Sequence, residues 1–211
     1  MKRICLIAGL ALLVLAWMLL AIENAASFSV HMIVHMAVVA GAAPLIAIGI
    51  SGTRHDFVAR LPMVTPISAS MIELVVVWGW HLPALRALSE TYPLVRATEQ
   101  ACFLIGGLVL WLSCFGGGGA GADARRLAGT LGLLFTSMHM TLLGALLSLA
   151  TRPLYGAGLV TCFGMTLTAS QDQQVGGVVM LLVGAAVYLA GGVALLARTL
   201  EAPPAAKHGK G

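Results

Sequence analysis

The sequence has very few charged residues. Only 9% of its 211 residues are Asp, Glu, Lys or Arg, whereas 59% are hydrophobic, and the mean hydropathy is +0.96. Soluble domains carry roughly 25% charged residues, so this composition excludes an ordinary soluble protein. The net charge of +4 is explained by membrane topology and lipid contact, and it gives no reason to expect a nucleic-acid partner. The chain is therefore predicted to be an integral membrane protein.

Cysteine is also scarce, with four residues and no CxxC pair. Cys5, Cys102 and Cys114 fall in apolar runs, where a thiol behaves as a small hydrophobic group. Cys162 stands alone in the loop 151–172, so a disulfide framework is not expected. The sequence also lacks an internal repeat of the kind found in many transporters, which weakens a transport function without excluding it.

Long apolar runs, in contrast, fill most of the chain. A helix needs about 20 apolar residues to cross about 30 Å of hydrocarbon. We therefore predict an all-α polytopic membrane protein, a bundle of about six transmembrane helices. The expected spans are residues 4–22, 28–50, 64–82, 97–115, 127–150 and 173–197. They form one transmembrane domain over residues 1–200, followed by a disordered cytoplasmic tail at 201–211.

The first run resembles a signal peptide because Lys2 and Arg3 precede it. Another span follows it almost at once, so we expect it to be retained as a helix.

The basic residues of the loops predict the orientation. With the N-terminus in the cytoplasm, nine of the twelve Lys and Arg residues lie inside and only Arg86, Arg96 and Arg152 lie outside. This bias is what the positive-inside rule expects. An even number of spans returns the C-terminus to the cytoplasm as well. The segments expected inside contain Lys2, Arg3, Arg54, Arg60, Arg125, Arg126, Arg198, Lys207 and Lys210.

A few polar residues interrupt the apolar runs, and they are the candidates for function. Polar groups are costly in hydrocarbon, so they face the interior of a bundle and often mark a site. The candidates are His31, His35, Glu73, His81, His139 and Asp172.

The stretch HMIVHM places His31 and His35 four residues apart, and hence on one face of a helix. Met32 and Met36 occupy the neighbouring stripe. Imidazole and thioether ligands suit copper, with the thioether favouring the cuprous ion. The alternative is that the two histidines only make hydrogen bonds between helices.

The other candidates lie at different depths. His81 and Asp172 stand at outer ends of spans, whereas His139 lies about 15 Å from either edge of the fifth span. His81 could instead cap the last carbonyls of its helix, and Asp172 could be a first-turn carboxylate favoured by the helix dipole. For Glu73, an interhelical hydrogen bond is the default expectation.

Four motifs resemble the multi-spanning CtaG-type cytochrome c oxidase assembly factor family, from about residue 28 to residue 190. They are HMIVHM…APLIAIG, WHLPALRAL, MHMTLLGALLSLATRPLYG and DQQVGGVVM, and they stand in the family's order. The resemblance implies a role in the biogenesis of haem–copper oxidases through help with copper supply. It implicates His31, His35, His81, His139 and Asp172, five of the six residues that their cost in a membrane singles out.

The chain also departs from that family. The segment after WHLP contains Arg96, Glu99 and Gln100 where further histidines are common in the family, so Glu99 would have to substitute for them. Six spans are expected here, where longer relatives have seven.

The resemblance, together with the polar residues in the spans, thus implies an assembly factor of the bacterial inner membrane, without enzyme activity, that binds copper transiently. Its partners would be oxidase subunits or other assembly factors. We expect two layers of ligands: an outer set of His31, His81 and Asp172, and a softer inner set of His35, His139, Met36, Met138 and Met140. Three alternatives stay open: a b-type haem between His35 and His139, a histidine–metal enzyme or a transporter, and a purely structural partner of the oxidase.

Overall fold

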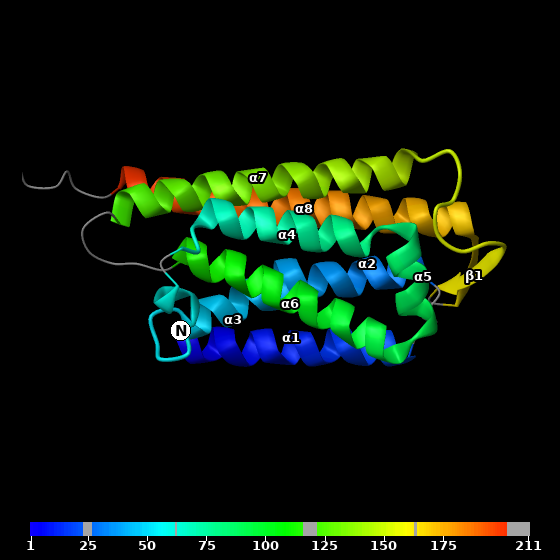
Figure 1. Ribbon diagram of the computed structural model, residues 1–211, viewed down its shortest axis with the longest axis horizontal. Helices are drawn as coiled ribbons and strands as arrows, with labels where there is room; N and C mark the ends of the chain where they lie inside the picture. Colours follow the sequence, from blue (N-terminus) through cyan, green and yellow to red (C-terminus); the bar gives the residue numbers. More distant parts are fainter. Residues whose placement is uncertain (23–26, 62, 116–121, 163, 202–211) are drawn as a thin grey trace, which may run out of the picture.

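A computed structural model describes residues 1–22, 27–61, 63–115, 122–162 and 164–201 of the chain. Its helices run side by side along one long axis (Figure 1). Within the described residues, five helices are long and apolar enough to cross a membrane, and a bent pair makes six when it is taken as one span. The prediction of an all-α polytopic membrane protein is confirmed. The predicted tail lies largely outside the described residues.

The first two predicted spans form an outer helix and a central one. Helix α1 (Lys2–Ile22) is mostly exposed and packs against the second span, which consists of α2 (Phe28–Met36), the π-helical η1 (Ala37–Ala42) and α3 (Ala43–Ile50). A π-helical turn releases backbone carbonyls from the regular pattern. One of them, Val39 O, accepts a hydrogen bond from Trp111 Nε1 at 3.1 Å. The second span is therefore fixed in the centre of the bundle.

The third predicted span is broken near its outer end. Helix α4 (Pro66–Trp80) is followed by α5 (Pro83–Thr91), and the two axes differ by 70°. Leu82 has an extended backbone, as is favoured before a proline, and Pro83 then opens α5. Residues 83–91 were expected to lie in a loop between spans, and that prediction was wrong.

The remaining spans are α6 (Pro93–Phe115), α7 (Ala122–Leu149) and α8 (Ala169–Leu200). Helices α7 and α8 pack along their length, because Gly144 and Gly177 let the backbones meet: a β-carbon on either would lie 2.8 Å from the other's carbonyl oxygen. Strands β1 (Leu159–Cys162) and β2 (Met165–Thr168) pair antiparallel between these two helices. The short 3-10 helix η2 (Val58–Arg60) lies in the loop before α4.

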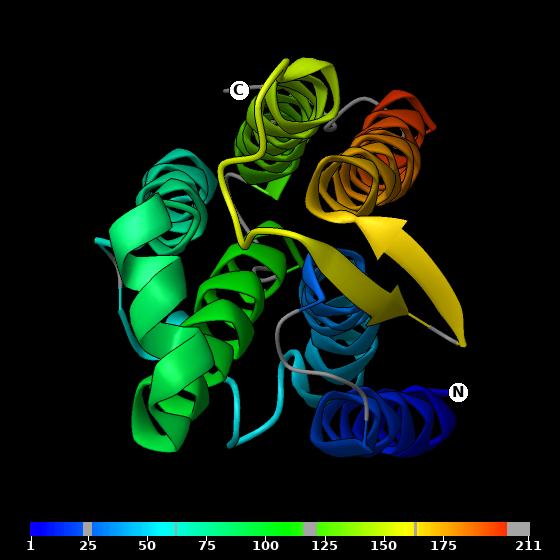
Figure 2. The ribbon, with the colours of Figure 1, turned by 90° about the vertical axis from the view of Figure 1, so that its right-hand side faces the viewer.

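The two ends of the bundle differ in content. One end holds α5, the start of α2 and the β1–β2 hairpin, and we call it the hairpin end (Figure 2). The other end holds Met1 and the loop that contains η2, and we call it the terminal end. Large apolar side chains such as Leu15, Ile105 and Leu182 are more than half exposed along the bundle, as lipid contact requires. That the hairpin end faces outside stays a prediction from the charge bias.

Candidate functional site

Three of the candidate histidines meet near the hairpin end. His31 and His35 lie on α2, and His81 is the residue that ends α4. Their ring centroids are 6.5 Å apart for His31 and His35, 6.1 Å for His31 and His81, and 5.4 Å for His35 and His81. No more than 5% of any of the three is exposed. We call these residues the histidine cluster.

Asp172 holds the start of α2 in place. From the first turn of α8 it accepts hydrogen bonds from the backbone nitrogens of Phe28 at 2.6 Å and Ser29 at 3.1 Å. The hydroxyls of Ser27, at 3.1 Å, and Ser29 also donate to it. These donors are the orphan N–H groups and the caps of a helix start, which favours a negative charge. Asp172 therefore acts on the α2 terminus, and its oxygens are occupied there rather than by the histidine rings.

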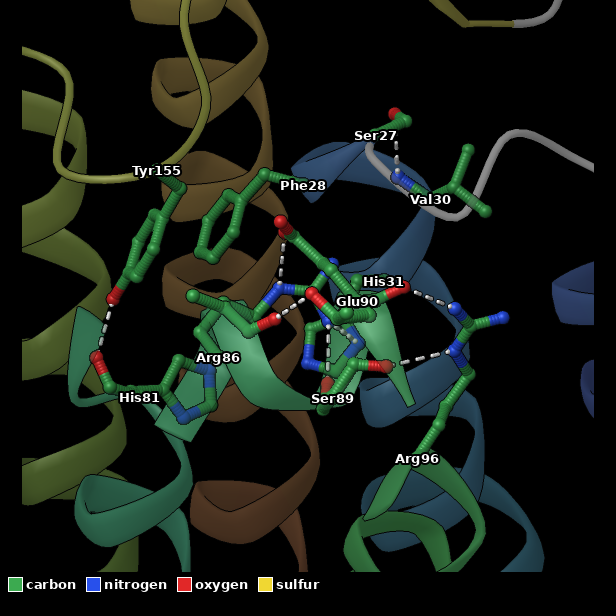
Figure 3. A network of polar contacts seen from close by, with 12 residues as sticks. Ser27, Phe28, Val30, His31, His81, Arg86, Ser89, Glu90, Arg96 and Tyr155 are labelled. Atoms are coloured by element: carbon green, nitrogen blue, oxygen red, sulfur yellow. Dashed lines mark hydrogen bonds and ion pairs between the residues drawn. The ribbon is translucent and has the colours of Figure 1, made fainter. Parts of the chain in front are cut away.

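His81 is held by two hydrogen bonds. Its Nδ1 lies 2.6 Å from Val77 O, and a carbonyl can only accept, so Nδ1 carries the proton and Nε2 has the lone pair. Tyr155, in the loop after α7, donates its hydroxyl to His81 O at 2.6 Å and stacks on Phe28 at 4.4 Å (Figure 3). Burial raises the pKa of Tyr155 to about 12, so the hydroxyl stays a neutral donor.

His31 belongs to a buried ionic network (Figure 3). Arg86 Nη1 donates to His31 Nδ1 at 2.9 Å, and His31 Nε2 lies 3.5 Å from Glu99 Oε1. Ser89 donates to Glu99 Oε2 at 2.9 Å, and Arg86 Nε pairs with Glu90 at 3.1 Å. Arginine has only donors, so a neutral His31 carries its proton on Nε2, toward Glu99. This network joins α2, α5 and α6.

The other ring nitrogens of the cluster have no hydrogen-bond partner among the described residues. They are both nitrogens of His35 and Nε2 of His81, together with His31 Nε2, which has only the 3.5 Å ionic contact with Glu99. The His35 ring packs against Phe103 at 4.1 Å, which keeps this part of the cluster apolar. These nitrogens are the groups in the cluster that could ligate a metal. As the side chains lie, the described residues contain no set of three or more His, Cys, Asp or Glu arranged to hold a metal ion.

The predicted inner ligands differ in exposure and in surroundings. His139 is 2% exposed, and its one ring contact in the described chain is with Phe135 at 5.6 Å. Met138 is 59% exposed on the outside of α7. Met36 and Met140 are buried, and they meet at α8 beside Gly184. The structure thus separates Met138 from the methionines predicted to accompany it.

Two residues of the site, Arg86 and Ser89, were not predicted from the sequence, although a basic residue inside a hydrophobic protein is a signal for function. The reason is that α5 was treated as a loop, where an arginine would be solvated. Glu99, named as a possible substitute for absent histidines, does face His31. The interhelical bond expected of Glu73 is confirmed, since Tyr188 donates to it at 2.8 Å.

Comparison with known proteins identifies the family of the chain. The chain matches the family described as cytochrome c oxidase caa3 assembly factor (Caa3_CtaG) over residues 1–202. No curated protein and no solved structure matches it. The matched region covers nearly the whole chain and includes the histidine cluster and the Arg86 network. The chain therefore belongs to the cytochrome c oxidase caa3 assembly factor family.

Proposed function

We propose that this assembly factor binds copper transiently in the histidine cluster and helps its delivery to a haem–copper oxidase. Membership of the family supports the role in oxidase assembly. The copper step rests on one observation: three ring nitrogens of His35 and His81 are buried without a hydrogen-bond partner in the described chain. A buried polar group left unpaired costs about 1–3 kcal/mol, and a bound metal would recover part of that cost.

His35 and His81 are the first ligands in this proposal. Copper accepts imidazole, and His81 has the arrangement common to metal-binding histidines, in which one ring nitrogen donates to a carbonyl and the other has a free lone pair. The rings come from α2 and α4, so a metal between them would link two helices. Phe103 beside His35 would exclude water from it.

His31 is the third ligand, and it is available only at a cost. Both of its nitrogens face other groups, Arg86 and Glu99, so it must give up one of these contacts before it can bind a metal. The site then has two ligands at rest and gains a third when His31 turns. A site with few ligands releases its metal more readily than a closed cage of four, which suits delivery.

Asp172 acts indirectly in this function. It fixes the start of α2 and thereby the position of His31 and His35 along the bundle axis relative to His81. We propose that the protein lies in the bacterial inner membrane with the hairpin end outside. There it would pass copper to oxidase subunits or to other assembly factors, without catalysing a reaction.

Metal analysis of purified protein tests the proposal. The parent chain from copper-replete cells should contain copper, and His35→Ala and His81→Ala should each lose most of it. His55→Ala, in an exposed loop at the terminal end, is the matched control and should retain the parent's copper. Each variant is compared at equal folded protein in the membrane. Equal copper in all four proteins would contradict the proposal, and a Soret band in the parent would favour haem instead.

A further inference from the structure

The buried methionines of this chain lie on three helices that pack together. The sequence has ten methionines. Met32, Met36, Met140 and Met180 are at most 2% exposed, whereas the other six are all at least 40% exposed. The buried four come from α2, α7 and α8. We call them the methionine cluster.

One face of α8 brings them together. Gly176, Met180 and Gly184 are spaced four residues apart, so they share that face. A β-carbon at Gly176 would lie 2.9 Å from Met32 Cγ. At Gly184 it would lie 3.0 Å from Met140 Cβ and 3.7 Å from Met36 Cε. The two glycines therefore make room for methionines of α2 and α7 on either side of Met180.

The methionine cluster adjoins the histidine cluster. Met32 and Met36 follow His31 and His35 directly in the sequence, and the same helix presents the histidines to α4 and α6 and the methionines to α7 and α8. A metal that leaves the histidines would therefore meet Met32 and Met36 on the adjoining face of α2.

We infer that the methionine cluster is a second metal site, specific for monovalent copper and filled from the histidine cluster. The inference rests on the proposed function. Thioether sulfur is a soft ligand that selects cuprous copper over harder ions. It is neutral and has no proton to lose, so binding transfers only the ion, with no change in protonation or oxidation state. Met140 and Met36 were predicted as soft ligands, while Met32 and Met180 take the place of the exposed Met138.

Methionine also fills irregular cores, and substitution by leucine separates the two roles. Leucine is similar in volume and apolar, so an exchange of this kind usually costs less than about 1.5 kcal/mol at one site. It removes the sulfur. A packing role therefore survives the exchange, whereas a ligand role does not.

The experiment is an anaerobic titration of the purified full chain with cuprous copper against a chromophoric chelator. The test variant carries Met32→Leu, Met36→Leu, Met140→Leu and Met180→Leu. The matched control carries Met18→Leu, Met71→Leu, Met138→Leu and Met165→Leu, all at exposed positions.

We expect the parent and the control to bind two equivalents of cuprous copper per chain, and the test variant to bind one. X-ray absorption at the copper edge should show sulfur neighbours in the parent that the test variant lacks. If the four-leucine test variant is poorly folded, the single exchanges Met36→Leu and Met180→Leu should each weaken the second equivalent at least tenfold.

The outcomes separate this inference from the proposed function. Suppose that the parent binds one equivalent of cuprous copper, which His35→Ala loses and the four-leucine test variant keeps. That result would overturn the second site and leave the histidine site standing. One equivalent that disappears only in the test variant would establish the methionine site and overturn the histidine site. A parent that binds no cuprous copper would overturn both.

Discussion

The two ends of the bundle treat charged side chains in opposite ways. At the hairpin end, Arg86 and Glu99 are at most 2% exposed and contact His31. At the terminal end, Arg126 and Asp123 pair at 3.1 Å but remain 38% and 65% exposed. Exposed pairs of this kind contribute little to stability, whereas a buried charge depends on its partner. The same residue types thus form a weak surface pair at one end and part of a buried network at the other.

The largest expected effect concerns which end faces which side of the membrane. A reporter inserted at Ala157, in the loop of the hairpin end, should be active outside the cytoplasm, and one inserted at Thr53, at the terminal end, should be active inside. The result should be all-or-none, because the charge bias is nine to three. Protein levels of the two fusions serve as the control. An outside signal at Thr53 would reverse the assignment of the two ends.

Removal of one buried charge should have the next largest effect. Arg86→Ala leaves Glu99 and His31 without their cationic partner, and we expect it to lower the free energy of unfolding by about 3–5 kcal/mol. Arg126→Ala should change it by about 0–1 kcal/mol, since that pair is exposed. Unfolding of both variants in the same detergent gives the comparison. Similar losses of unfolding free energy in Arg86→Ala and Arg126→Ala would show that charged side chains contribute equally to stability at the two ends.

The smallest effect is expected at Cys162. This thiol is buried in the hairpin, and its sulfur lies 3.1 Å from Ser29 Oγ. Cys162→Ser replaces the sulfur by a hydroxyl oxygen that can keep the contact with Ser29, so we expect a change of no more than about 1 kcal/mol in the free energy of unfolding. Copper content and oxidase maturation should be unchanged. Loss of oxidase activity at a normal membrane level of the variant would show that the thiol itself is required.

Local patterns predicted the parts of the site that depend on one helix. The spacing of His31 and His35 places them on one face whatever surrounds the helix, and the structure finds their rings 6.5 Å apart. The position of His81 before Leu-Pro marked the end of α4. Met138 and Met140 could not both be inner ligands, because residues two apart point in different directions on a helix. That part of the inner set could have been corrected from the sequence.

The sequence by itself determined that this is a helical membrane protein, because the length and apolarity of a run decide whether it can span hydrocarbon. It also determined the candidate polar residues, since each is costly there. Only the tertiary structure decided what each one does. The 70° bend at Pro83 sends Arg86 into the bundle, and the packing of α8 on α2 gives Asp172 to a helix start far away in the chain. These contacts join distant segments, and the periodicity of any one helix contains no information about its neighbours.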